Sequence, residues 1–133
     1  MTVEQESAQD SLVDKIAATV DTYVRLVSSG TGEQIADLFA AGGTVEDPIG
    51  TPVRTTREEI VEFYGVIANM ETRTTVLNWK KIAGDTAVFE FVLTTGTGGM
   101  TFEITPVDIM VFDDEGKIVS MRAVWQPSDL KQV

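Results

Sequence analysis

The chain contains no cysteine and no histidine, and these two absences exclude much ordinary enzyme chemistry. Without cysteine there is no disulfide, no thiolate nucleophile and no cysteine-ligated metal. Without histidine, the most common general base and transition-metal ligand is missing, and a Ser-His-Asp triad cannot form. Any proton transfer must therefore be carried out by aspartate, glutamate, tyrosine or lysine.

Basic residues and long apolar runs are also scarce. The chain has 10 Lys and Arg against 21 Asp and Glu, a formal net charge of −11. An acidic surface has no basic patch for a phosphate backbone, so we expect neither nucleic-acid nor anionic-membrane partners. No apolar run approaches the roughly 18 residues of a membrane span, and the polar N-terminus is unlike a signal peptide. We therefore expect a cytoplasmic protein.

The length and composition are those of one globular domain. The chain has 133 residues, of which 43% are hydrophobic and 23% charged, and it shows no repeat or linker. We predict a flexible leader over residues 1–11 and a single domain over residues 12–133. The acidic clusters show no metal-ligand spacing, so we expect no metal and no cofactor.

Three helices are predicted in the first half of the chain. Apolar residues recur at three- and four-residue steps over residues 12–27, the pattern of an amphipathic helix. A short second helix is expected around residues 35–39, ended by the glycine pair at 42–43. Thr56 and Glu59 have the spacing of a capping box and open the third helix.

After residue 69 the apolar period changes to two, which is typical of strands. Helices followed by an antiparallel meander indicate an α+β fold, in which we expect the three helices to pack in the concave face of a curved, mostly antiparallel sheet. A pocket should open on that concave side. The four predicted strands cover residues 74–82, 86–95, 100–112 and 117–125.

Asp108 is the most informative single residue, because it lies in the otherwise apolar run 104–112. Side chains alternate along a strand, and neither face of this run is polar, so the carboxyl is predicted to be buried. Burial disfavours the charged form of an acid, and a protein keeps such a group when it is paired or has a task. The alternatives are an ion pair with Arg54, Arg57 or Arg122, or a wrong strand register.

Two further residues could take part in chemistry. Tyr23 lies on the apolar face of the first helix, where it could be an ordinary core tyrosine or a hydrogen-bond donor aimed into a cavity. Asp47 precedes Pro48 at the end of an extended segment and could be a turn aspartate or a general base at a pocket mouth. Tyr64 and Trp125 are most simply packing residues.

Several segments resemble the bacterial delta-5-3-ketosteroid isomerases, and they occur in the order found in that family. The segment Thr44-Val45-Glu46-Asp47-Pro48 is fairly specific, whereas each of the others alone would be weak. The similarity extends over roughly residues 12–127. The matching segments are residues 23–27, 41–50, 62–64, 105–108 and 119–123.

The resemblance implies the cone fold of the nuclear transport factor 2-like superfamily and isomerisation of 3-oxo-delta-5-steroids to 3-oxo-delta-4-steroids. It implies that Asp47 is the general base and that Tyr23 and a protonated Asp108 donate hydrogen bonds to a dienolate oxygen. Tyr64 would support Tyr23 through a hydrogen bond without contacting the substrate itself. Phe39 stands where some members carry a further tyrosine, so this hydrogen-bond chain would be shorter.

An apolar steroid substrate requires apolar walls, and hydrogen bonds to an oxyanion are stronger in such surroundings. The resemblance, together with the open outer face expected of the sheet, also implies a homodimer. Residues predicted to line the substrate pocket are Phe89, Phe91, Val92, Met110, Val124 and Trp125.

Other functions remain open at this point, because the cone fold serves many chemistries. An epoxide hydrolase of this fold would need an Asp-Arg-Asp arrangement, with Arg54 or Arg122 inside the pocket. A polyketide cyclase usually relies on an Asp with a His partner, and the chain has no histidine. A steroid- or lipid-binding module without turnover is the non-enzymatic alternative.

Overall fold

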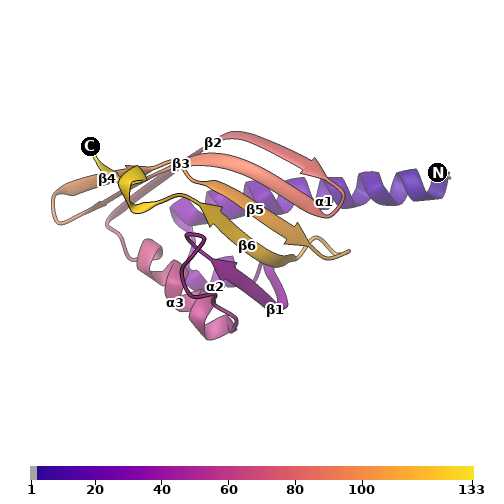
Figure 1. Cartoon of the computed structure of the whole chain (residues 1–133), viewed down its shortest axis with the longest axis horizontal. Helices are drawn as coiled ribbons and strands as arrows, with labels where there is room; N and C mark the ends of the chain where they lie inside the picture. The colour runs from indigo at the N-terminus through magenta and orange to yellow at the C-terminus, as the bar shows by residue number, and fades with distance from the viewer. Residues whose placement is uncertain (1–2) are drawn as a thin grey trace.

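The computed structural model describes the backbone of residues 3–133 and the side chains of residues 11–133. The chain forms three helices and a sheet of seven strands, of which the first strand lies between the second and third helices (Figure 1). The helices are α1 (Val3–Ser29), α2 (Gly32–Ala36) and α3 (Arg57–Ala68). The strands are β1 (Phe39–Glu46), β2 (Thr72–Ala83), β3 (Thr86–Thr97), β4 (Met100–Ile104), β5 (Val107–Phe112), β6 (Ile118–Val124) and β7 (Lys131–Gln132), with a short 3-10 helix at Pro127–Asp129.

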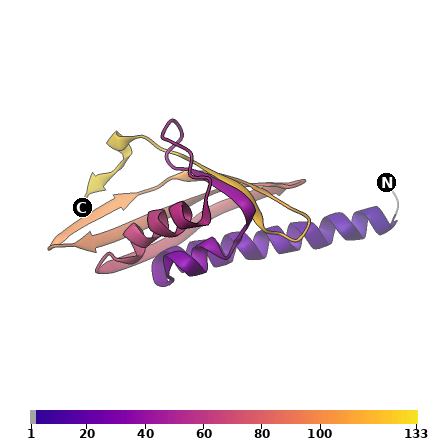
Figure 2. The same ribbon diagram turned by 90° about the horizontal axis from the view of Figure 1, so that it is seen from below.

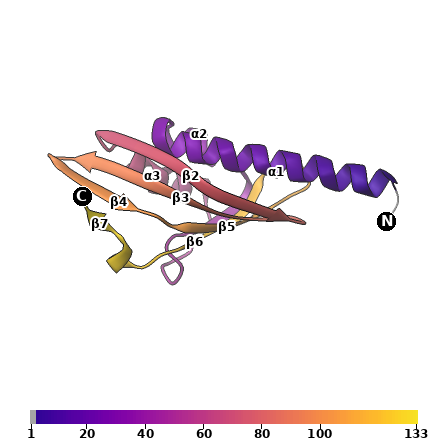
Figure 3. The same ribbon diagram turned by 90° about the horizontal axis from the view of Figure 1, so that it is seen from above.

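The first helix is longer than predicted. It begins at Val3 instead of residue 12, and its N-terminal end extends beyond the sheet (Figures 2 and 3). The proposed leader includes residues 1 and 2, which lie outside the described residues, and its flexibility stays a prediction. The division into a leader and a single domain also stays a prediction.

The second helix was predicted too long, because part of that segment is the first strand. Helix α2 ends at Ala36, and β1 begins at Phe39. Glycines 42 and 43 do not end a helix but lie in β1, where its register against β6 shifts between Phe39 and Thr44. A Cβ on Gly43 would lie 3.0 Å from the carbonyl oxygens of Ala40 and Ile118, so this close backbone approach favours glycine.

The third helix begins as predicted. The Thr56 side chain accepts a hydrogen bond from the Glu59 N–H, and the Glu59 side chain accepts one from the Thr56 N–H. This capping box satisfies backbone donors that the first turn would otherwise leave unpaired. It fixes the start of the helix that carries Phe63 and Tyr64.

The sheet is mixed, because β1 pairs with β6 in parallel while the other named pairs are antiparallel. Strand β3 is long enough to pair with β5 through residues 86–90 and with β4 through residues 93–97. The single strand predicted over residues 100–112 is therefore wrong: it is divided at Thr105 and Pro106, and Pro106 has no N–H for the ladder.

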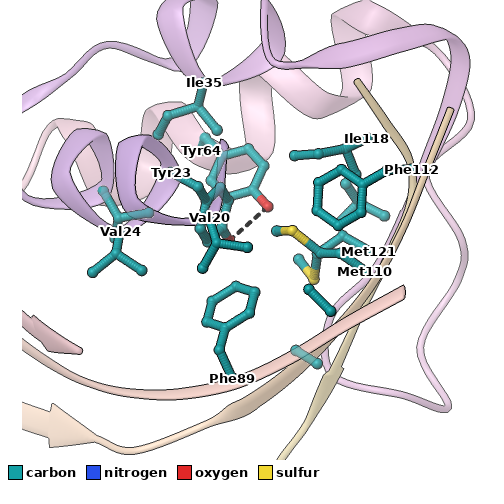
Figure 4. Close-up of a cluster of buried hydrophobic side chains, with 14 of the residues drawn as sticks. Val20, Tyr23, Val24, Ile35, Tyr64, Phe89, Met110, Phe112, Ile118 and Met121 are labelled. Atoms are coloured by element: carbon teal, nitrogen blue, oxygen red, sulfur yellow. Dashed lines mark hydrogen bonds between the residues drawn. The ribbon is translucent and has the colours of Figure 1, made fainter. Parts of the chain in front are cut away.

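All three helices lie on one side of the curved sheet, and the core fills the space between them (Figures 1 and 2). The predicted α+β class is confirmed. Within the described residues no helix is long and apolar enough to cross a membrane. The buried side chains shown in Figure 4 come from α1, α2, α3 and the inner face of the sheet, and include Val20, Ile35, Phe112 and Met121.

Candidate active site

A cavity of about 440 Å³ lies between the helices and the inner face of the sheet. Most of its lining is apolar, and its acidic and phenolic groups are Asp47, Asp108, Tyr23 and Tyr64. A pocket of this kind can hold a rigid apolar molecule and present a few polar groups to one part of it. The remaining lining residues are Val27, Phe63, Val66, Ile67, Met70, Phe91, Leu93, Thr95, Thr97, Phe102, Ile104, Pro106, Trp125 and Leu130.

Asp108 occupies the inner face of β5, as the alternation along the strand predicted. Its side chain is 1% exposed, and among the described residues its Oδ1 has no hydrogen-bond partner. Burial, and next the negative charge of Asp47, raise the pKa of Asp108 well above its usual value, while the nearby Tyr23 hydroxyl opposes this change. Both effects favour a protonated carboxyl that can donate a hydrogen bond into the cavity.

Tyr23 and Tyr64 meet in the core through their hydroxyl groups, which are 2.9 Å apart and hydrogen-bonded (Figure 4). Their rings pack edge to face, with centroids 5.8 Å apart. Burial, and then the charge of neighbouring groups, raise the pKa of each phenol well above its usual value. Both hydroxyls therefore keep their protons, and if Tyr64 donates to Tyr23, the Tyr23 proton remains free for a ligand. The Phe39 ring also contacts Tyr64, with centroids 6.3 Å apart.

Asp47 follows directly after β1, and its neighbour fixes its direction. Glu46 pairs with Arg122 across the parallel ladder, with 3.0 Å between Oε1 and Nε. Since successive side chains point to opposite faces, Asp47 points into the cavity, where the indole N–H of Trp125 donates to its Oδ1 at 2.6 Å. Burial raises the pKa of Asp47 above its usual value, and this hydrogen bond and the positive charge of Arg54 offset part of that rise.

Of the six predicted wall residues, Phe91 and Trp125 line the cavity. Phe89 and Met110 are fully buried in the core and do not line the cavity, because other side chains cover them. Val92 and Val124 were assigned to the wrong face. Val92 alternates with the inward-facing Phe91, and Val124 is 48% exposed.

Sequence reasoning missed two parts of the site. The indole of Trp125 was predicted only as a wall, but it also donates a hydrogen bond to Asp47. Much of the wall comes from α3, from the turn after it and from the segment after β6, including Ile67, Met70 and Leu130. The helical period of α3 indicated a buried face, but nothing in the pattern separates a residue in the core from one at a cavity.

Within the part of the chain that the structure describes, no group of three or more His, Cys, Asp or Glu side chains could hold a metal ion. The acidic and phenolic groups of the cavity are instead two carboxyl groups, of which Asp108 is the one whose protonated form burial favours more, and two phenols. Such a set can remove a proton from carbon and stabilise the resulting oxyanion. An apolar pocket with these groups, enclosed by three helices and a curved sheet, is typical of a cone-fold protein that binds a small molecule.

Comparison with known proteins agrees with this class. Residues 20–121 match the model of the SnoaL-like domain, and the chain belongs to this nuclear transport factor 2-like family. It is 39% identical over 116 residues to the steroid Delta-isomerase of Nocardioides simplex, and the aligned region covers 87% of this chain and 94% of that relative. The resemblance to ketosteroid isomerases predicted from the sequence is thereby confirmed.

Two solved structures share the fold. SalBIII, described as an epoxide hydrolase/cyclase-like enzyme with a role in pyran ring formation in polyether salinomycin, has a TM-score of 0.80 at 26% identity, covering 88% of this chain and 95% of its own. RV0760c from Mycobacterium tuberculosis has a TM-score of 0.81 at 22% identity, covering 90% of this chain and 96% of its own.

The retained proton of Asp108 makes stability depend on pH. The unfolded chain releases this proton near the ordinary pKa of about 3.9, whereas the folded chain holds it to higher pH. Rising pH therefore opposes folding of the unsubstituted protein through this group. We expect Asp108→Asn, a neutral replacement, to gain stability relative to the unsubstituted protein as the pH rises from 3 to 7, measured by urea unfolding.

Asp114→Asn is the matched control for loss of one acidic group, because Asp114 lies in an exposed turn. If the stability difference between Asp108→Asn and the unsubstituted protein is the same at pH 3 and pH 7, Asp108 does not retain its proton on folding.

Proposed function

We propose that the protein is a steroid delta-isomerase that converts 3-oxo-delta-5-steroids to 3-oxo-delta-4-steroids. The observation that carries the proposal is that Asp47, Tyr23 and Asp108 line one largely apolar cavity. The similarity to a steroid Delta-isomerase over most of the chain supports the same reaction. Moving one hydrogen along a rigid apolar molecule requires a base, oxyanion donors and apolar walls, which this cavity contains.

In the proposed reaction, Asp47 acts as the general base. Its carboxylate removes a proton from the carbon between the carbonyl and the double bond, and returns it to C6 to give the conjugated enone. One carboxylate can carry the proton between two carbons on the same face of the substrate. The Trp125 hydrogen bond supports this role, because it orients the carboxylate and favours its charged form.

Tyr23 and protonated Asp108 would donate hydrogen bonds to the oxygen of the dienolate. Ketosteroid isomerases are the known example of a carboxylic acid kept neutral for this purpose, and this assignment follows that family. Burial of both groups supports it, as does the Oδ1 of Asp108, which has no hydrogen-bond partner within the described part of the chain. Tyr64 would hold the Tyr23 hydroxyl in position through the hydrogen bond between them.

The cavity favours this reaction over the alternative enzymes. An epoxide hydrolase with an Asp-Arg-Asp arrangement needs an arginine in the pocket, and no arginine is among the described residues that line it. Arg122 pairs with Glu46 on the outer face, and Arg54 packs against the outer side of Phe63. Binding of a steroid without any change in its ultraviolet spectrum would indicate a binding module without turnover.

Replacement of the base is the most direct test. Asp47→Asn should lower the rate of conversion of a 3-oxo-delta-5-steroid by about 10²- to 10⁴-fold, because the amide cannot accept the proton. The rate is followed by the ultraviolet absorbance of the conjugated enone, and steroid binding should persist. Glu46→Gln is the matched control, since Glu46 is the adjacent acid but points outward. Full activity of Asp47→Asn would exclude this base.

The oxyanion donors can be tested separately. Tyr23→Phe should raise the activation free energy by about 2–4 kcal/mol, the usual effect of losing one such donor. Tyr64→Phe should have a smaller effect, because the Tyr64 hydroxyl contacts Tyr23. The comparison is made on kcat in the same absorbance assay. Equal effects of the two substitutions would contradict the assignment of Tyr23 as the direct donor.

We also propose that the protein is a homodimer and that it acts in the cytoplasm. The outer face of the sheet supports a dimer, because Val76, Trp79 and Val124 are 60%, 44% and 48% exposed on it. An apolar sheet face of this kind is typical of an interface. Light scattering at micromolar protein should give twice the mass of one chain, and the mass of a single chain would contradict the proposal.

A further inference from the structure

Arg54 is held close to the proposed base by the backbone. Its N–H donates to the Val45 carbonyl at 2.8 Å, and the Val45 N–H donates to the Arg54 carbonyl at 3.0 Å. Val45 precedes Asp47 by two residues in the same segment. The position of Arg54 relative to Asp47 is therefore set by a two-hydrogen-bond bridge between backbone segments, and not by a mobile loop.

The guanidinium group of Arg54 lies over the ring of Phe63, with 4.2 Å from Cζ to the ring centroid. Phe63 lines the cavity, so its ring separates the cation from the cavity. Among the described residues, Nη1 of Arg54 is buried and has no hydrogen-bond partner, and no carboxylate lies within ion-pair distance of the group. An unpaired cation in partly desolvated surroundings acts on charges over a longer range than one in water.

We propose that Arg54 is a positioning residue of the reaction: its cation, held over the Phe63 ring and without a direct ion-pair partner among the described residues, keeps the Asp47 carboxylate charged before the substrate binds, without touching the substrate. The inference rests on the proposed role of Asp47 as the base. The proposed role is electrostatic, because Arg54 is not among the described residues that line the cavity or hydrogen-bond to Asp47.

The need for such a cation follows from the groups that face Asp47. Tyr23 from α1, Tyr64 from α3 and Asp108 from β5 line the same cavity, and none of them carries a positive charge. The Trp125 indole is a neutral donor. Burial therefore favours the protonated form of Asp47, and one hydrogen bond opposes it. Arg54 is the charged group that lowers the pKa of Asp47, as the second influence after Trp125.

The remaining charges around this region do not replace Arg54. Arg122 is next to the ladder position of Asp47, but its charge is paired with Glu46 on the outer face. Glu59 and Glu62 line a groove beside Arg54 on the solvent side of α3. Glu59 accepts hydrogen bonds from Thr55 and Thr56 at the helix start, which hold its carboxylate at the cap, and these bonds together with the charge of Arg54 lower the pKa of Glu59. Glu59 therefore offsets part of the Arg54 charge without forming a direct ion pair with it.

A charged base is required before the substrate arrives, because a protonated carboxyl cannot accept a proton from carbon. The acid limb of the pH profile of kcat/KM reports the protonation of such a base in the free enzyme. If Arg54 maintains the charge, its removal moves that limb to higher pH. A purely structural role would instead lower the rate equally at all pH values.

The test compares neutral and charged replacements of Arg54. Arg54→Met removes the cation but keeps an apolar side chain over Phe63, and Arg54→Gln is a second neutral replacement in case one variant does not fold. Arg54→Lys retains the charge. Arg122→Met is the matched control, because it removes a nearby arginine that is already paired and exposed. Each variant is assayed with a 3-oxo-delta-5-steroid across the acid limb.

For each neutral variant, the loss of kcat/KM is measured relative to the unsubstituted protein. We expect this loss to be about three- to tenfold larger at pH values below the acid limb than at pH values above it. Arg54→Lys and Arg122→Met should keep the limb of the unsubstituted protein. The proposal is overturned if the limb does not move in the neutral variants, or if Arg54→Lys moves it as far as they do.

A second measurement separates this inference from the proposed function. The carboxyl carbon of Asp47 can be followed by ¹³C NMR in protein labelled at aspartate, with Asp47→Asn to assign its resonance. The midpoint of its titration should move to higher pH in Arg54→Met and Arg54→Gln and return in Arg54→Lys. If the protein does not isomerise steroids, the proposed function fails, while this titration still shows whether Arg54 keeps Asp47 charged.

Discussion

The structure depends on one costly constraint, which is the burial of the Asp108 carboxyl among apolar side chains, where its Oδ1 has no hydrogen-bond partner in residues 11–133. Burial of a polar group without a partner opposes folding, so the surrounding core must supply the compensating stability. The helices and the inner face of the sheet do this by packing a continuous apolar cluster around the cavity. The same burial raises the pKa of this carboxyl and so favours its protonated form.

The two acids of the cavity differ because their neighbours differ. Asp108 is buried within a central strand and also lies in the field of Asp47, and both influences favour its neutral form. Asp47 lies at the end of an edge strand, is only partly buried, and has a donor and a cation near it. Burial raises the pKa of both acids, but the Trp125 donor and the Arg54 charge offset part of the rise at Asp47, so the charged form is less disfavoured there than at Asp108.

The sequence predicted the features that depend on local order, including the period of α1, the cap at Thr56 and the face of Asp108. It did not predict those that depend on distant partners. The glycine pair at 42–43 suggested a helix end, but it allows β1 to approach β6. Alternation places Val92 on the face of Glu90, opposite to that of Phe91, so the prediction that both Phe91 and Val92 line the cavity did not follow the period of the strand.

The residues at the outer rim of the cavity contribute less to the core than the residues deep inside it. Leu130 lines the cavity but is 47% exposed, and it precedes a two-residue strand that pairs with β4 at the sheet's margin. No buried core residue lies in the 127–132 segment. Substitutions in this segment would change the shape of the entrance while the acids and phenols stay in place. Ligand specificity could therefore evolve here with little effect on the stability of the fold.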